Sequence, residues 1–176
     1  ATSAGRPSAA RCVEQLPPHL AALGLPADVA RWHLIGPIQS NKARRAVGPF
    51  VLLHAVDGWP LACKLDAVAG ERAGRQAILL EVNLTREPQK HGVAPEAAAE
   101  LAARIAAECR HLDLQGLMTM ARFGAGEAEL RATFGGLRRL AEACRPASGL
   151  PLPHLSMGMS DDFETAVAEG ATIVRI

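Results

Sequence analysis

The strongest constraint on the fold of this chain is the alternation of short apolar runs with segments of helical periodicity. The runs are rich in leucine or β-branched residues and are bounded by glycine, proline or polar residues, as strands are. Six such runs are RWHLIG (31–36), VLLHAV (51–56), AILLEVNL (77–84), LQGLMTM (114–120), HLSMGM (154–159) and TIVRI (172–176). Segments 94–109 and 126–144 each place apolar residues on one helical face, and shorter helices are expected at 41–47, 60–72 and 161–169.

This alternation predicts the α/β class, because parallel strands need crossover connections that are usually helical. The runs VLLHAV and AILLEV are apolar at nearly every position, as strands buried on both faces should be. No G-x-G-x-x-G follows any run, which argues against a dinucleotide-binding Rossmann domain. We therefore predict a parallel (β/α) TIM-type barrel that is incomplete, because six strands fall two short of eight.

Length, composition and charge narrow the class of protein. With 176 residues and 49% hydrophobic content, the chain is expected to form a single domain over residues 1–176. The net charge is +1 and the basic residues are spread among acids, so no nucleic-acid partner is predicted. No apolar window of about 18 residues and no signal-peptide pattern is present, so no membrane partner is expected and we predict a soluble, cytoplasmic protein.

Several familiar site types lack their motifs. Cys12, Cys63, Cys109 and Cys144 lie 35 to 51 residues apart, which fits neither paired zinc ligands nor a small disulfide framework. The sequence also has no H-E-x-x-H metal motif, G-x-S-x-G nucleophile elbow or G-x-x-x-x-G-K-[ST] phosphate loop. We predict reduced cysteines and no metal site.

The closing stretch, HLSMGMSDDFETAVAEGATIVRI (154–176), offers a possible anion site. If it forms strand, helix and strand, Ser160 lies at the helix N-cap, where a hydroxyl and free N–H groups can hold a phosphate. The alternative is that Ser160 and Asp161 only cap the helix. Arg175, on the next strand, points either into the site or into a salt bridge at the strand end.

Two further clusters follow predicted strands, where a barrel keeps its chemistry. WHLIGPIQSNKARR (32–45) brings together His33, Gln39, Asn41 and Lys42. His33 is either functional or a hydrogen-bonded core residue, and His54 and His154 are weaker candidates.

The second of these clusters is VNLTREPQKHG (82–92), whose Lys90 faces either an anionic ligand or solvent. The run GLMTM (116–120) is interpreted as barrel packing.

Four segments in this order resemble the pyridoxal-phosphate homeostasis proteins, whose fold is like the N-terminal barrel domain of alanine racemase. They are WHLIGPIQSNK, VNLTREPQKHG, GLMTM and HLSMGMSDDFETAVAEGATIVRI, and the match spans roughly residues 11 to 176. The resemblance implies pyridoxal 5′-phosphate (PLP) at the C-terminal ends of the strands.

The resemblance also implies roles for individual residues. Ser160 would bind the phosphate, and Arg175 would face the pyridine nitrogen, which suits a carrier or a racemase better than a transaminase. Lys90 would lie near the ligand. His33, Asn41 and Met157 match further motif positions and are included as candidate cofactor-binding residues.

The sequence also departs from the family pattern. The family's Schiff-base lysine lies in a segment resembling A-V-S-K, and a G-E-N-x-x-Q-E motif follows; here only ARCVEQ (10–15) resembles the end of that motif. None of Lys42, Lys64 and Lys90 can substitute by position, and the family's Gly-Thr after Ile176 is missing. We expect barrel strands three to eight of an incomplete copy, and weak, non-covalent PLP binding.

Three functions follow from these observations. The prediction is a non-catalytic PLP carrier in vitamin B6 and amino-acid homeostasis, with PLP-dependent apoenzymes as possible recipients. The alternative is a racemase-like PLP isomerase, which needs two bases, a lysine and a tyrosine in the racemases; the chain lacks that lysine and contains no tyrosine. The third is a truncated remnant that binds no cofactor.

Overall fold

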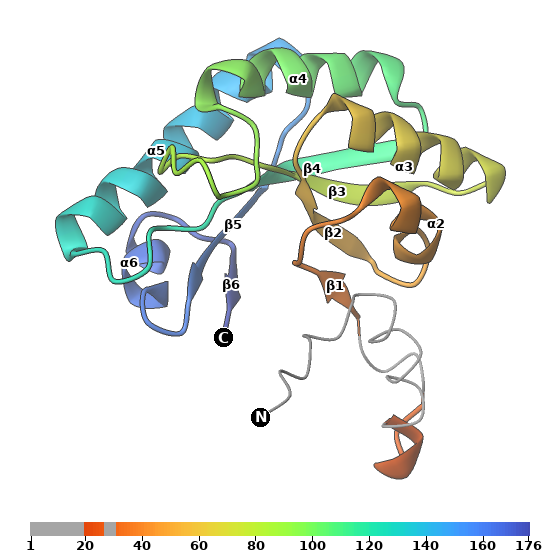
Figure 1. Ribbon diagram of the computed structural model, residues 1–176, viewed down its shortest axis with the longest axis horizontal. Coiled ribbons are helices and arrows are strands. Elements are labelled where there is room, and N and C mark those ends of the chain that lie inside the picture. The colour runs from red at the N-terminus through yellow and green to blue at the C-terminus, as the bar shows by residue number, and fades with distance from the viewer. Residues whose placement is uncertain (1–19, 27–30) are drawn as a thin grey trace.

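A parallel sheet with its strands in sequence order forms the centre of the molecule. The computed structural model describes residues 20–26 and 31–176 of the chain. Every neighbouring pair of strands is parallel, and the sheet curls into part of a barrel (Figure 1). The strands, in order, are β1 (His33–Leu34), β2 (Leu52–Val56), β3 (Gln76–Glu81), β4 (Leu112–Met118), β5 (His154–Met159) and β6 (Ile173–Arg175). All six predicted strands and the α/β barrel class are confirmed, whereas Cys12 and segment 10–15 lie outside the described residues.

Helices follow the strands at the predicted places. They are η1 (Ser40–Lys42), α2 (Ala43–Ala46), α3 (Trp59–Glu71), α4 (Pro95–Glu108), α5 (Glu127–Ser148) and α6 (Phe163–Ala168). The helix expected over 126–144 continues for one more turn because Pro146 lies in that last turn without ending it, and Gly149 at φ 69° closes the helix. In Figure 1, α3, α4 and α5 form an arch along one side of the sheet.

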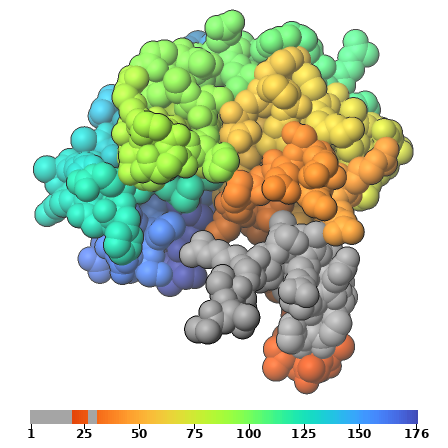
Figure 2. Space-filling model, viewed as in Figure 1, coloured from red at the N-terminus to blue at the C-terminus, as the bar shows by residue number. Residues whose placement is uncertain are grey.

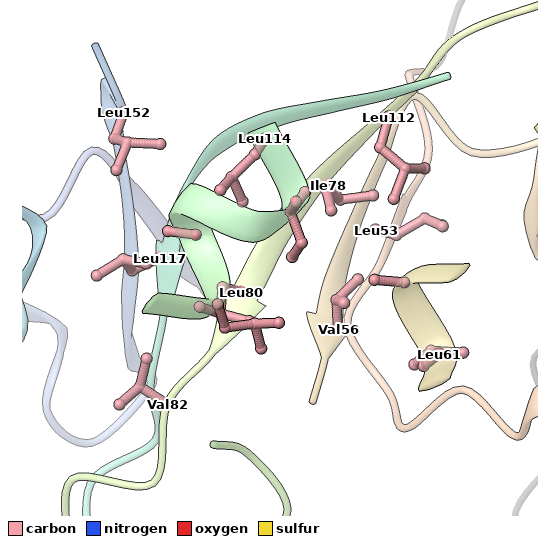
Figure 3. Packing of buried hydrophobic residues seen from close by; sticks show 14 of the residues in the cluster. Leu53, Val56, Leu61, Ile78, Leu80, Val82, Leu112, Leu114, Leu117 and Leu152 are labelled. Carbon is pink, nitrogen blue, oxygen red and sulfur yellow. The ribbon is translucent and has the colours of Figure 1, made fainter. Parts of the chain in front are cut away.

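The face of the sheet that meets the helices, here called the outer face, carries the main hydrophobic core. Alternate residues along each strand point to this face, as the period of a strand requires. Figure 3 shows Leu53 of β2, Leu80 of β3 and Leu117 of β4 gathered there, and all three are fully buried. The core includes residues of every helix from α2 to α6, so the burial of this face holds the helices to the sheet.

The opposite, concave face, here called the inner face, is more polar. Its apolar part is a small separate cluster of Leu52, Ala55, Leu79 and Met118. The other inward positions include His54, Glu81 and Ser156, which are the buried polar residues nearest the C-terminal ends of β2, β3 and β5. Polar groups therefore line the end of the barrel where this fold keeps its sites.

β4 and β5 lie so close together that one glycine is required. A Cβ placed on Gly116 would lie 1.9 Å from the carbonyl oxygen of His154. Gly116 is also the partner of His154 in the β4–β5 register. Any side chain at residue 116 would therefore push the two strands apart.

The sheet order ends at β1 and β6, the two shortest strands, and these do not pair with each other in the described part of the chain. His33 of β1 is consequently exposed although its neighbour Leu34 is buried against the core. Within residues 20–26 and 31–176, no helix has the length and apolar character needed to cross a membrane.

Candidate functional site

A continuous chain of polar contacts crosses the inner face from β1 to β6. His33 Nδ1 lies 3.0 Å from His54 Nε2, and His54 Nδ1 lies 2.8 Å from Ser156 Oγ. Arg175 donates from Nη1 to Ser156 Oγ at 2.8 Å and from Nη2 to the carbonyl oxygen of Thr119 at 3.1 Å. The network thus joins four strands and the end of β4.

The parallel register explains why residues so distant in sequence meet. Met118 is the partner of Ser156 on one side, and Ile173 is its partner on the other. Arg175, two residues beyond Ile173, points to the same face of β6. Its long side chain can therefore reach back to Ser156.

His54 is held in its neutral form by its surroundings. Burial, together with the nearby His33, Arg175 and His154, lowers the pKa of His54 to about 4. The ring has no exposed surface. At neutral pH the network therefore contains one fixed positive charge, that of Arg175.

Glu81 is the second unusual titratable group of the inner face. The pKa of Glu81 is raised to about 7, mainly by burial and also by Asp57, and His91 and Arg175 offset only part of this rise. Glu81 lies at the end of β3 and is 4% exposed. Near neutral pH this carboxyl group exchanges a proton easily, as groups at functional sites often do.

Ser160 lies in the turn after β5 and not at a helix N-cap, so that prediction is wrong. The N-cap of α6 is Asp162, whose carboxylate accepts a hydrogen bond from the Met159 N–H at 2.5 Å. Two residues of tight turn therefore separate Ser160 from the helix. Ser160 is exposed, and its N–H and that of Asp161 have no protein partner among the described residues.

Arg175 takes the first of its two predicted orientations and points into the site. It has no carboxylate partner in the described part of the molecule, and it uses one N–H of each terminal nitrogen on Ser156 and Thr119. The remaining guanidinium donors have no acceptor among residues 20–26 and 31–176. An arginine with free donors in a half-buried position can bind an acceptor atom or an anion.

Lys90 lies in the loop between β3 and α4 and is engaged within the protein. Its ammonium group is paired with Glu87 and donates to the carbonyl oxygen of Ala121 at 3.0 Å. Figure 2 shows this loop, coloured yellow-green, on the near face of the molecule. A direct contact of Lys90 with a ligand stays a prediction. In the structure, Lys90 links its own loop to Ala121 in the loop after β4.

The remaining predicted site residues lie apart from one another. His33 belongs to the network, whereas Asn41 is exposed on η1. Met157 is fully buried in the main core with residues of α5 and α6, so its side chain has no surface with which to touch a ligand. The roles of Asn41 and Met157 at a cofactor stay predictions.

Sequence reasoning missed Ser156 and Glu81 and gave His54 little weight. Each is a polar residue inside an apolar run, at HLSMGM, AILLEVNL and VLLHAV. Counting alternate positions from the outward leucines would have placed all three on the inner face. The signal was present, but the runs were interpreted as uniformly apolar.

Other site types are absent or lie elsewhere. No group of three metal-ligating side chains occurs within the described residues. A cavity of about 220 Å³ lies beside α4 and the start of β4, lined by residues including Ile105, Cys109 and Leu112. It is remote from the C-terminal ends of the strands and shares no residue with the network.

The chain is similar to known proteins over most of its length. The family described as alanine racemase, N-terminal domain, matches residues 14–176. The pyridoxal phosphate homeostasis protein of Aquifex aeolicus is 41% identical over 82% of the chain, and that of Synechocystis is 37% identical over 93% of it. The chain spans 63% and 74% of the length of these two curated relatives, respectively.

Solved structures are also similar to this chain over most of its length. PipY of Synechococcus elongatus has been solved without PLP, with 40% identity and a TM-score of 0.82, over 93% of this chain and 75% of that one. The structure of PipY with PLP bound has 39% identity and a TM-score of 0.80 over the same shares. An alanine racemase of Clostridium difficile, 12% identical with a TM-score of 0.69 over 81% of this chain and 37% of that one, shares the fold.

Proposed function

The chain belongs to the pyridoxal phosphate homeostasis proteins within the alanine racemase N-terminal domain family, and from this premise we propose that it binds PLP without catalysing a reaction. The observation that carries the proposal is the inward guanidinium of Arg175, which is held by hydrogen bonds to Ser156 and Thr119. Its other N–H donors have no acceptor among the described residues. PLP-bound PipY, 39% identical, supports the choice of ligand.

The residues present fit two of the three parts of PLP. A pyridine nitrogen is an acceptor and suits the unused donors of Arg175. A phosphate suits the N–H groups of Ser160 and Asp161 and the hydroxyl of Ser160, which have no protein partner in the described part of the chain. PLP itself would supply an electrophilic aldehyde and an electron-withdrawing ring, and the permanently charged Arg175 weakens that ring as an electron sink.

The third part of PLP, its aldehyde, finds no lysine amine on the inner face within residues 20–26 and 31–176. Lys42 and Lys64 are exposed on η1 and α3, and Lys90 is paired with Glu87. We therefore propose that this chain holds PLP by non-covalent contacts alone. Loss of the covalent bond predicts weak binding.

A non-catalytic role is also the better account of the inner face. Racemisation needs a base on each side of the substrate. The chain has no tyrosine, and His54 is buried and already hydrogen-bonded at both ring nitrogens. The proposal is accordingly a carrier and not an isomerase.

The direct test is equilibrium dialysis of the protein against PLP, followed by borohydride treatment and mass measurement. We expect saturable binding, no borohydride-fixed adduct on a lysine, and an affinity at least tenfold lower for Arg175→Gln. Arg145→Gln, at the exposed end of α5, is the matched control and should bind normally. Absence of binding would favour the non-binding alternative, and a fixed adduct at one lysine would contradict non-covalent binding.

We also propose PLP-dependent apoenzymes as recipients, a role consistent with the name of the relatives. The test is the recovery of activity when an apoenzyme is mixed with PLP-loaded protein and a scavenger of free PLP. Recovery no faster than with the scavenged PLP alone would argue against a carrier.

A further inference from the structure

Arg175 determines which atoms donate and which accept along the hydrogen bonds of the inner-face network; we call this the direction of the network. A guanidinium group can only donate hydrogen bonds, so Ser156 Oγ must accept from Nη1. Ser156 is fully buried, and its hydroxyl hydrogen therefore needs an acceptor of its own. Among the described residues, the remaining partner of Ser156 Oγ is His54 Nδ1 at 2.8 Å. Ser156 consequently donates to His54.

This direction determines the tautomer of His54. If Nδ1 accepts, the hydrogen of the neutral ring lies on Nε2, which then donates to His33 Nδ1 at 3.0 Å. In the opposite tautomer, Nδ1–H and Arg175 would both donate to Ser156 Oγ. The buried serine hydroxyl would then be left without an acceptor, which folded proteins avoid.

Burial of the network supports the same arrangement. A protonated His54 would be a donor at both nitrogens and would place a second positive charge beside Arg175. Desolvation opposes a positive charge on His54. His33 on β1, His154 on β5 and Arg175 on β6 lie near the ring and oppose it as well. A neutral His54 is therefore the form that can accept the serine hydroxyl.

We propose that Ser156 and His54 are positioning residues that hold the Arg175 guanidinium in one orientation on the inner face. They act through Arg175 and need not touch the ligand. The relevance to PLP rests on the proposed function, whereas the positioning itself does not. His33, at the exposed end of the network, completes it by accepting from His54.

The first experiment is ¹⁵N NMR of histidine-labelled protein at pH 7 without ligand, with His54→Gln used to assign the His54 signal. We expect a neutral ring with its hydrogen on Nε2. A hydrogen on Nδ1 or a charged ring would overturn the proposal. The tautomer is measured on the unaltered chain, and the variant serves only to assign the signal, so the result does not depend on how Ser156 variants fold.

The second experiment compares Ser156→Ala with Ser148→Ala, a matched control whose hydroxyl donates to the Cys144 carbonyl at the end of α5. In ¹⁵N-arginine spectra, the restricted guanidinium of Arg175 should become freely rotating in Ser156→Ala and stay restricted in Ser148→Ala. PLP affinity should fall at least tenfold in Ser156→Ala and be unchanged in the control.

Failure of this proposal differs visibly from failure of the proposed function. If the unaltered protein binds no PLP, the proposed function is wrong, and the guanidinium signals alone judge the positioning. An Arg175 that stays restricted in Ser156→Ala would show that Ser156 does not position it. A freely rotating Arg175 with unchanged PLP affinity would instead contradict the link between this orientation and PLP binding.

Discussion

The two faces of the sheet are built from the same strands but differ in chemistry. The outer face buries leucines such as Leu80 and Leu117 against helices, whereas the inner face buries His54, Glu81 and Ser156. Apolar burial stabilises the fold in proportion to area, while buried ionisable groups cost stability unless they are neutral or paired. The outer face therefore stabilises the fold, whereas the polar inner face lowers the stability and provides the candidate site.

The largest effect is expected on the outer face. Leu117→Ala should lower the free energy of unfolding by about 2–5 kcal/mol, because Leu117 is fully buried between the sheet and the helices. Leu23→Ala, at a position that is 73% exposed, should change it by less than about 0.5 kcal/mol. Urea denaturation measures both, and equal effects would contradict the assignment of the core.

Glu81→Gln should change how stability depends on pH. The pKa of Glu81 is raised to about 7 in the folded protein, so the native state binds more protons than the unfolded state between about pH 4.5 and 7. The contribution of Glu81 to the free energy of unfolding should therefore fall as pH rises through this window, by up to roughly 3 kcal/mol. Glutamine cannot ionise and should remove this slope.

The control for Glu81 is Glu108→Gln at the exposed end of α4. It should leave the pH dependence unchanged. Denaturation curves at pH 5, 6, 7 and 8 measure the slopes, and a Glu81→Gln variant that keeps the slope of the unaltered protein would refute the raised pKa.

His54→Gln should reveal a slope of opposite sign. The pKa of His54 is lowered to about 4, so the unfolded state binds more protons between about pH 4 and 6.5, and stability is lost as pH falls through that window. The change is again up to roughly 3 kcal/mol. The slopes of His54 and Glu81 oppose each other between about pH 4.5 and 6.5.

The unaltered protein should consequently show little pH dependence from these two residues in the shared window. Each single variant should expose the slope of the other residue. Parallel slopes in the two variants would mean that the inner face does not hold one carboxyl and one imidazole in their neutral forms.

The smallest effect is expected far from both faces. Arg44 and Glu71 form a surface ion pair at 2.5 Å with side chains that are 64% and 50% exposed. Glu71→Gln should lower stability by less than about 1 kcal/mol, and salt should reduce the difference. A larger loss of stability in thermal unfolding would contradict the small contribution that the exposure of this ion pair predicts.

The strands and helices could be predicted because their signals are local. Runs such as VLLHAV contain enough leucine and valine to mark a strand wherever it lies in the fold. The predicted end of α5 was short by one turn because a proline in the last turn removes a donor without stopping the helix.

The candidate site was only partly predictable because it depends on register. Arg175 was identified from its motif, but whether it points inward is decided by its place two residues beyond Ile173, the partner of Ser156. Ser160 was misplaced because the Asp162 carboxylate binds the Met159 N–H and tightens the turn before the helix begins. Such competition between neighbouring caps is not visible in a sequence pattern.

Lys90 joins two loops that follow different strands. It pairs with Glu87 in the loop after β3 and binds the Ala121 carbonyl in the loop after β4. The two loops at the rim of the barrel are thereby coupled mechanically, and Lys90→Met should raise the rate of amide hydrogen exchange in both. If only one loop exchanges faster, the coupling is absent. Faster exchange in both loops would show that a single ammonium group ties together two segments that are more than 30 residues apart in the sequence.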